Sequence, residues 1–488
     1  MAEIHRGTWI RPTKTELLTG WMGAQRWYAS KGSVPDLAVL AAWRLPDPAG
    51  EVGIETLLVS DSAGPEPVTY QVPLTYRSAP LDALAHALVG TMEHGVLGPR
   101  WVYDGAHDPV YAAALMTMIQ SESVAESSSE SDVLDDRFAG HTASSWHSRI
   151  RVIASKVLVG EQSNTSVILD TTDADGTATP IIVKIFRTLS HGDNPDVVLQ
   201  SALREAGCAR VPDVVGSVLG TWPSSPSRSG AGTDLGTGHL AFAQEFIPGS
   251  EDAWRVALRA ASGGTDFTVA ARELGAATAD VHNALADALP TTTAGPPDIA
   301  RITAVTRRRL MAASALVPEI AARADRIEAV IAAAESAPWP ALQRIHGDYH
   351  LGQVLHSPDR GWLLLDFEGE PLRPLAERSL PDSPFRDIAG MLRSFDYAGG
   401  SVEHDSPGSS ARAWVDNGVT AFLDGYASQG TDPRERHDLL RVFLLDKALY
   451  EVVYEARNRP TWLAIPVAAI TRLLEHRGEH DEERGASS

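Results

Sequence analysis

Apolar and polar residues alternate over the first part of the chain. This period of two, seen in the runs ETLLVS and VTYQVPLTYR, is typical of strands with one buried face. Helices are expected before and after these strands, around residues 15–24 and 81–89. The pattern therefore predicts a small mixed domain at the start of the chain.

The pattern changes twice further along. After residue 148, four short apolar runs predict strands, with one helix near residues 196–206, so that a β-rich lobe is expected. From about residue 252 the spacing becomes helical, and only residues 344–370 break it with strand-like runs. The four runs are RIRVIASKVL, SNTSVILD, PIIVKIF and LAFAQEF, and the expected helices cover residues 254–261, 267–289, 298–337, 411–426 and 432–456.

Three stretches are rich in Ser, Gly, Thr or Asp and predict linkers or surface loops: residues 121–132, 171–179 and 222–238. The first of them is the best candidate for a domain boundary. The predicted organisation is a cap domain over 1–121, a Ser-rich linker over 122–147, a β-rich nucleotide-binding lobe over 148–250, and a helical catalytic and sugar-binding lobe over 251–488.

Composition narrows the class of protein. With 488 residues, 43% hydrophobic and 22% charged, the chain is expected to fold into more than one globular domain. A net charge of -21 repels polyanions and disfavours a nucleic-acid partner. The single cysteine, Cys208, cannot form an intrachain disulfide, and no apolar run is long enough to span a membrane. We therefore expect a cytoplasmic enzyme that acts on a small molecule.

Candidate chemistry is concentrated in IHGDYHLGQVL, residues 345–355, and WLLLDFEGEP, residues 362–371. Transfer of a γ-phosphoryl group to a hydroxyl needs one carboxylate to orient the hydroxyl and accept its proton. It also needs oxygen ligands for the Mg²⁺ that bridges the phosphates. Asp348 is the predicted catalytic base, Gln353 and Asp366 are the predicted metal ligands, and Glu368 is a further candidate ligand.

The order HGDxHxxQ followed by DFEGEP resembles the aminoglycoside phosphotransferase-like kinases, and most of all the maltokinases and glucosamine kinases of actinobacteria. The blocks QRWYASKG, GEQSNTSVI, PDSPFRDIAGMLRSFDYA and DKALYEVVYEARNRP extend the resemblance through nearly the whole chain. It implies an α+β, bilobal protein-kinase-like fold with an additional N-terminal α/β cap domain. ATP and Mg²⁺ are the implied cofactors.

The resemblance also implies a nucleotide site. Lys184 would pair with the α and β phosphates, and either Asp196 or Glu205 would steady it, because Val198 stands where the family carries an acidic residue. The stretch EQSNTS would cover the phosphates, and QEF would contact adenine through its main chain. The implied nucleotide-binding residues are Lys184, Ser163, Asn164, Thr165, Ser166, Gln244 and Phe246.

Sugar-binding residues are expected in the block DKALYEVVYEARNRP, where Asp446, Lys447, Tyr450, Tyr454 and Arg457 are spaced to share one helix face. Asp348 and His350 complete the predicted acceptor set, although His346 and His350 are assigned no proton transfer. Arg386, Asp387, Arg393 and Asp396 are interpreted as a buried ion-pair network behind the site rather than as substrate ligands.

The leading hypothesis is transfer of phosphate from Mg-ATP to maltose, giving maltose 1-phosphate. The alternative is a glucosamine kinase forming glucosamine 6-phosphate, favoured if carboxylates cluster where an ammonium sits and if the pocket admits only one ring. Leu444 and Leu445 stand where the family usually has an acidic or polar residue, which indicates a changed specificity if that position faces the sugar. An aminoglycoside phosphotransferase and an inactive kinase-fold scaffold are less favoured. The expected partner is a small sugar, with no membrane, and the expected state is a monomer or weak homodimer.

Overall fold

The computed structural model describes residues 8–130, 133–158, 164–225, 234–370, 373–406, 408 and 410–475. The chain divides into two compact units. The first comprises Met1–Ser201 and Pro212–Pro248, and the second comprises Ala202–Val211 and Gly249–Ser488. Among the described helices, none is both long enough and apolar enough to cross a membrane.

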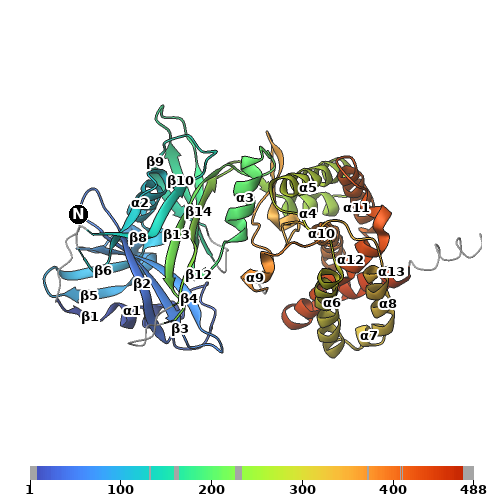
Figure 1. Ribbon diagram of the computed structural model, residues 1–488, viewed down its shortest axis with the longest axis horizontal. Helices are drawn as coiled ribbons and strands as arrows, with labels where there is room; N and C mark the ends of the chain where they lie inside the picture. Colours follow the sequence, from blue (N-terminus) through green and yellow to red (C-terminus); the bar gives the residue numbers. More distant parts are fainter. Residues whose placement is uncertain are drawn as a thin grey trace, which may run out of the picture. The chain divides into compact units, whose positions relative to one another are not determined.

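One large antiparallel sheet dominates the first unit (Figure 1). Strands from the predicted cap and from the predicted nucleotide-binding lobe both belong to it, because β7 and β8 connect β2 to β13. The short strand β12 (Thr188–Leu189) pairs with β4. In spatial order the other strands are β1 (Ile10–Arg11), β5 (Leu88–His94), β6 (Gly98–Asp104), β4 (Val68–Arg77), β3 (Gly53–Asp61), β2 (Leu37–Leu45), β7 (Val124–Ser127), β8 (Leu134–Thr142), β13 (Val214–Pro223), β14 (Leu235–Glu245), β11 (Ile181–Phe186), β10 (Asn164–Thr172) and β9 (Arg151–Val157).

Helix α2 (Pro109–Gln120) supplies much of the core of the first unit. It begins at Asp108, whose side chain accepts a hydrogen bond from the Val110 amide, and it buries Tyr111, Leu115 and Ile119 in the same cluster as residues of β8 and β14. The other helices are α1 (Lys14–Met22), the 3-10 turns η1 (Asp82–Ala87) and η2 (Gly105–His107), and α3 (Pro195–Glu205).

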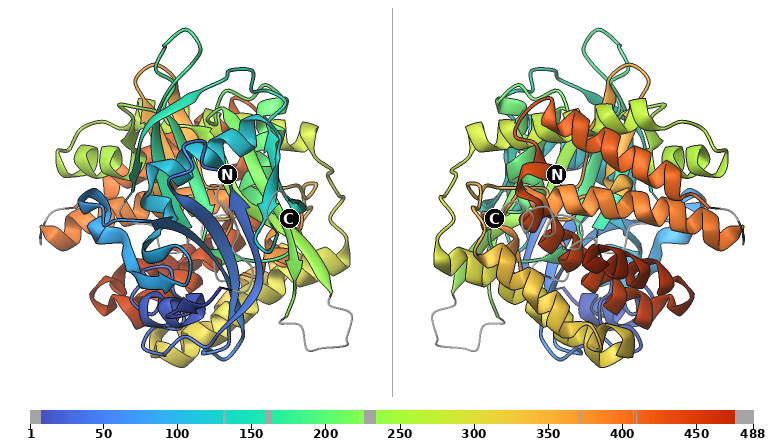
Figure 2. Two further views of the ribbon diagram at one scale, coloured as in Figure 1. Left: turned by 90° about the vertical axis from the view of Figure 1, so that its left-hand side faces the viewer. Right: turned by 90° about the vertical axis from the view of Figure 1, so that its right-hand side faces the viewer.

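The second unit is helical, with one small sheet (Figure 1 and the yellow to red elements in Figure 2, right). Its main core gathers buried side chains of α6, α8, α10, α12 and α13. The helices are α4 (Ala253–Ser262), α5 (Thr268–Ala288), α6 (Pro296–Leu316), α7 (Pro318–Ala321), α8 (Ala324–Glu335), α9 (Leu375–Arg378), α10 (Phe385–Asp405), α11 (Arg412–Ala427), α12 (His437–Asn458) and α13 (Ala464–Glu475). The 3-10 turns are η3 (Leu351–Gln353), η4 (Pro433–Arg436) and η5 (Pro460–Trp462), and the sheet is β15 (Glu251–Asp252), β16 (Val354–Ser357) and β17 (Gly361–Leu364).

The predicted α+β class, with a β-rich first part and a helical second part, is confirmed. Three local predictions need correction. The helix expected over 298–337 is divided at Pro318, which lacks the amide hydrogen that a continuous helix needs. The helix expected over 81–89 is only the 3-10 turn η1, followed directly by β5.

The third correction concerns the Ser-rich stretch. Residues 122–147, expected to form a linker, contribute β7 and β8 to the sheet. The backbone of β7 pairs with both β2 and β8, and these ladder hydrogen bonds do not depend on apolar side chains. The limits of the predicted domains remain a prediction.

Candidate active site

The loop that carries Asp348 is shaped by a buried carboxylate on α10. Asp387 accepts hydrogen bonds from the backbone amides of His346 at 2.8 Å and Gly347 at 2.9 Å. His282 of α5 lies against the same carboxylate, with Nε2 3.1 Å from Oδ2. Gly347 has φ +84, a left-handed conformation that favours glycine. The predicted structural role of Asp387 is therefore confirmed, and it fixes where the next residue, Asp348, points.

The two histidines of this loop are held by hydrogen bonds. His346 Nε2 donates to the carbonyl of Leu365 at 2.8 Å, and His350 Nδ1 accepts the amide of Gly352 at 3.0 Å. Burial disfavours the charged imidazole and lowers the pKa of His350 to about 4, although the nearby Asp348 carboxylate opposes the shift. His350 is therefore neutral near pH 7, and both contacts fit a supporting role.

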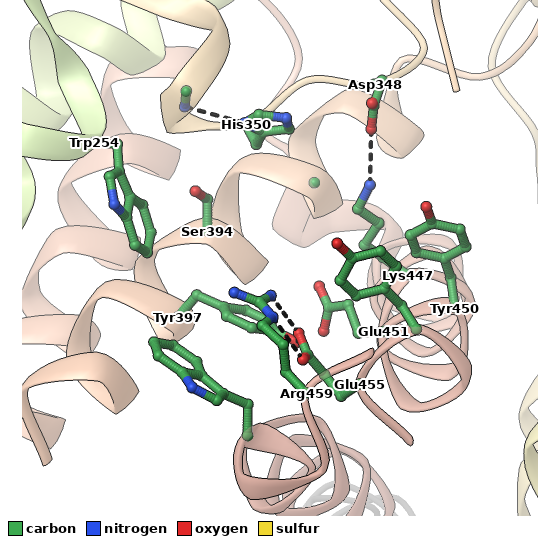
Figure 3. A pocket seen from close by; sticks show the side chains of 14 residues that line it. Trp254, Asp348, His350, Ser394, Tyr397, Lys447, Tyr450, Glu451, Glu455 and Arg459 are labelled. Carbon is green, nitrogen blue, oxygen red and sulfur yellow. Dashed lines mark hydrogen bonds and ion pairs between the residues drawn. The ribbon is translucent and has the colours of Figure 1, made fainter. Parts of the chain in front are cut away.

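Asp348 forms an ion pair with Lys447 of α12. The Lys447 Nζ lies 3.0 Å from Asp348 Oδ1, and the two side chains are only 16% and 22% exposed (Figure 3). Burial is the largest influence and favours the neutral carboxyl, but the charge and hydrogen bond of Lys447, together with the nearby His350 and His346, outweigh it and hold the pKa of Asp348 below its usual value. Burial likewise favours neutral Lys447, yet Asp348, Glu370 and Glu451 raise its pKa above the ordinary range. The pair is thus ionised at neutral pH.

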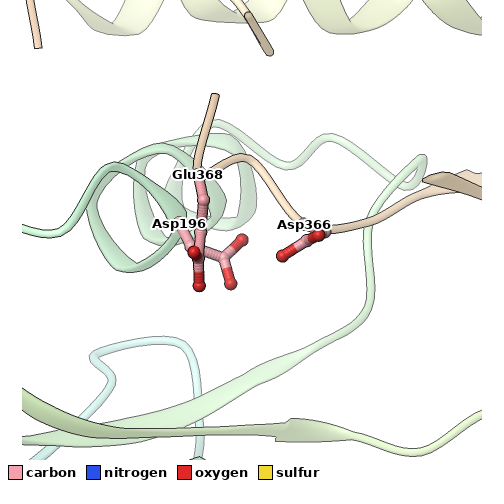
Figure 4. Close-up of side chains that lie close together, drawn as sticks. All are labelled: Asp196, Asp366 and Glu368. Carbon is pink, nitrogen blue, oxygen red and sulfur yellow. The ribbon is translucent and has the colours of Figure 1, made fainter. Parts of the chain in front are cut away.

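The predicted metal ligands flank the hairpin of β16 and β17, with one of them before β16 and two after β17. Gln353, at the end of η3, donates from Nε2 to Asp366 Oδ2 at 3.0 Å, and the Leu365 amide donates to the Gln353 carbonyl at 2.9 Å. Asp366 has φ +62, which costs a non-glycine residue about 1 kcal/mol or more. Carboxylate oxygens of Asp366 and Glu368 lie within 4.8 Å of each other (Figure 4). Amide and carboxylate oxygens are the donors that Mg²⁺ prefers, so the set suits that ion.

A pocket of about 380 Å³ opens beside Asp348. One face of α12 forms much of its wall, because residues three and four apart project from the same side of a helix. Figure 3 shows these side chains around the pocket, with Trp254 of α4 opposite. The lining residues are Trp254, Asp348, His350, Gly352, Gly390, Ser394, Tyr397, Lys447, Tyr450, Glu451, Tyr454, Glu455, Arg459 and Trp462.

Glu451 is held from behind by the buried Arg393. Two guanidinium nitrogens of Arg393 lie 2.9 and 2.7 Å from Glu451 Oε2, and the same side chain contacts Asp396. Burial outweighs the favourable charge of Arg393 and raises the pKa of Glu451 above its usual value. The prediction that Arg393 and Asp396 belong to a buried ionic network is confirmed.

Glu455 has two partners at the pocket wall. Arg459 donates to it from Nη2 at 2.6 Å and from Nε at 3.0 Å, and the Tyr397 hydroxyl donates at 3.1 Å. The pocket therefore contains two carboxylates on successive turns of α12, Glu451 and Glu455, in addition to Asp348.

Two residues predicted to contact sugar do not line this pocket. Asp446 is buried and bonded to Arg309 at 2.6 Å and to Arg386 at 2.7 Å, and Arg457 is exposed elsewhere on α12. Consecutive helical residues point about 100° apart, so Asp446 and Lys447 cannot share one narrow face. Leu444 and Leu445 belong to the apolar core instead.

Several lining residues were not predicted. Glu451 and Glu455 carried a usable signal, since they stand four and eight residues after Lys447. Trp254 comes from a distant segment and carried none, whereas Tyr397 lies in the block PDSPFRDIAGMLRSFDYA that extends the resemblance. Arg459 follows α12 within the block DKALYEVVYEARNRP, and Trp462 lies two residues beyond the end of that block.

The predicted nucleotide-binding residues lie in the first unit, apart from Ser163, which lies outside the described residues. Lys184 of β11 forms an ion pair with Asp196 of α3 at 2.7 Å, so Asp196 is a partner of this lysine. The buried residues Asn164, Thr165 and Ser166 begin β10 rather than forming a loop, and Thr165 accepts a hydrogen bond from Arg187 at 2.8 Å. Gln244 lies in β14, and Phe246 follows that strand, its amide bonded to the Pro180 carbonyl.

Comparison with known proteins decides the family. Residues 156–437, more than half of the chain, match the phosphotransferase enzyme family. The chain belongs to this family. Residues 21–108 also match the maltokinase N-terminal cap domain, so the predicted combination of a cap with a phosphotransferase fold is confirmed. Membership in this family also supports the predicted enzyme class.

Two similar proteins and one solved structure are named glucosamine kinase. A glucosamine kinase of Streptacidiphilus jiangxiensis is 32% identical over 257 residues, which cover 49% of this chain and 58% of that protein. A glucosamine kinase of Mycolicibacterium smegmatis is 28% identical over 351 residues, covering 68% of this chain and 83% of that protein. A solved structure of a glucosamine kinase with glucosamine, ADP and inorganic phosphate matches with a TM-score of 0.63 at 22% identity, over 95% of this chain and 99% of that one. This structural likeness supports the fold.

Proposed function

We propose that this phosphotransferase is an ATP-dependent sugar kinase whose preferred acceptor is an amino sugar, glucosamine, with glucosamine 6-phosphate as the product. The observation that carries the proposal is the acidic wall of the pocket. Glu451 and Glu455 line it on the same helix that brings Lys447 to the base Asp348. A carboxylate in a largely desolvated pocket favours an ammonium over a neutral hydroxyl. The two similar proteins named glucosamine kinase support the same acceptor.

The proposed reaction uses Asp348 as the base. Its carboxylate, kept ionised by Lys447, accepts the hydrogen bond of the acceptor hydroxyl and then its proton. The hydroxyl oxygen forms the new bond to the γ-phosphorus, and the bond between that phosphorus and the bridging oxygen of ADP breaks. Because phosphoryl transfer proceeds through a loose transition state, orientation by Asp348 contributes more than strong basicity.

ATP is the proposed phosphoryl donor, since a structurally similar kinase was solved with ADP. Lys184, braced by Asp196, would contact the nucleotide phosphates. Gln353 and Asp366 would hold Mg²⁺, with Glu368 nearby, and the ion would neutralise charge on the transferring phosphates. Main-chain contact of adenine near Gln244 and Phe246 remains a prediction.

Maltose is the second candidate acceptor. The match of residues 21–108 to a cap domain named for maltokinases favours it, and aromatic side chains in the pocket offer faces for sugar rings. The acidic wall gives maltose no advantage, because a neutral disaccharide carries no positive charge for the carboxylates to attract.

The test is ADP release from Mg-ATP with glucosamine, maltose, glucose and an aminoglycoside supplied separately. We expect the highest kcat/KM with glucosamine and a far lower value with glucose, which differs from it only at the amino group. Equal values for glucosamine and glucose would contradict recognition by the acidic wall, and preference for maltose would assign the second candidate instead.

A further inference from the structure

Arg459 occupies a site within the acceptor pocket that has the composition of a cation-binding cage. Its guanidinium carbon lies 5.0 Å from the ring centre of Trp462 and 5.5 Å from that of Tyr454. On another side it forms two hydrogen bonds to Glu455, at 2.6 and 3.0 Å. Aromatic faces combined with a carboxylate are the chemistry by which proteins recognise organic cations.

The two members of this ion pair differ sharply in exposure. The side chain of Glu455 is 1% exposed, whereas that of Arg459 is 46% exposed. Arg459 follows the last residue of α12, so its backbone lies at the edge of the helix rather than within it. The carboxylate is therefore a fixed part of the pocket wall, and the arginine is the partner that can leave.

We propose that Arg459 is a resident cation that occupies the amino-group subsite, and that the ammonium of an amino sugar displaces it. This inference rests on the proposed function, because it concerns how the same pocket chooses its acceptor. When Arg459 leaves, Glu455 loses its positively charged partner, and an ammonium that enters the cage replaces that charge. A neutral sugar would leave Glu455 buried without a cation, which is unfavourable. Arg459 thereby sets selectivity for cationic over neutral acceptors.

The cost of displacement sets the size of the effect. An ion pair with one partly exposed member contributes up to about 1 kcal/mol, which corresponds to an open state disfavoured by about fivefold. The apparent affinity of any ligand that needs the open state is reduced by the same factor. Removing the arginine side chain should therefore raise the apparent affinity for glucosamine by that factor and leave the affinity for a neutral sugar unchanged.

The kinetic test compares Arg459→Ala with the wild-type protein at neutral pH, where the amino group of glucosamine is mostly protonated, using glucosamine and glucose as acceptors. We expect the KM for glucosamine to fall by about fivefold in the variant, with the KM for glucose unchanged. As a matched control, Arg272→Ala removes an exposed arginine of α5 that pairs with the half-buried Asp424 and does not line the pocket. A rise in KM for both sugars would show that Arg459 binds the acceptor directly, and no change in either KM would also overturn the proposal.

A second measurement needs no turnover. In Arg459→Ala the vacated cage should bind methylguanidinium, and the adjacent Trp462 should report the binding as a saturable change in tryptophan emission. The wild-type protein and the double variant Arg459→Ala, Glu455→Gln should show no such change. Absence of binding to the single variant would refute the cage. Failure of wild-type turnover with glucosamine would instead refute the proposed function, so the two failures are distinguishable.

Discussion

Replacing Lys447 by Met tests the ion pair that keeps Asp348 charged. The Nζ lies 3.0 Å from Asp348 Oδ1, and both side chains are largely buried, so solvent screens the interaction little. A charge-assisted hydrogen bond of this kind contributes about 1.5–3 kcal/mol. Without it, burial would favour the protonated carboxyl and raise the pKa of Asp348. A protonated Asp348 cannot take the proton from the sugar hydroxyl.

The assay is the pH dependence of kcat/KM. In the wild-type protein the lowered pKa of Asp348 keeps the base ionised down to acidic pH. In Lys447→Met the acidic limb of this profile, where kcat/KM falls as pH is lowered, should move to higher pH. Half-maximal kcat/KM should be reached at a proton concentration about tenfold to hundredfold lower than in the wild-type protein. Lys447→Arg retains the charge and should keep the limb near its wild-type position. An acidic limb that is identical in the wild-type and Met proteins would refute the reasoning.

Three further predictions concern separate parts of the molecule. Lys184→Met, which removes the partner of Asp196, should raise the KM for ATP by about 10- to 100-fold in steady-state kinetics; an unchanged value would remove Lys184 from the nucleotide site. Glu451→Gln keeps the shape but removes the charge, so the KM for glucosamine should rise more than that for glucose, and equal changes would contradict an electrostatic role. Gly347→Ala should destabilise the fold by about 1–2 kcal/mol, because φ is +84, and thermal unfolding measured by circular dichroism should detect it as a lower midpoint; an unchanged midpoint would contradict this.

Local chemistry could be predicted from the sequence because its groups are close together along the chain. Asp348 and Gln353 are five residues apart. Asp366 comes directly after an apolar run that forms most of β17 and ends at Leu365. The single-face spacing of α12 likewise predicted Lys447 and Tyr450 at the pocket. The same spacing also selected Asp446 and Arg457, which do not line the pocket, so spacing along one helix locates the site but not each of its members.

The remaining features depend on tertiary contacts that no local pattern encodes. Trp254 reaches the pocket from α4, and Arg393 supports Glu451 from another helix. The strand β7 forms in a Ser-rich stretch because neighbouring strands supply its backbone partners. Asp446 was predicted to bind sugar, but the positions of Arg309 and Arg386 turn it into part of the core.

The most direct test of the central claim is glucosamine-dependent ADP release by Asp348→Asn alongside the wild-type protein. Asparagine keeps the shape of the side chain but cannot accept the acceptor's proton, so we predict loss of turnover with ATP binding retained in a nucleotide-binding assay. Turnover at the wild-type rate would contradict Asp348 as the base of an acceptor-phosphorylating kinase.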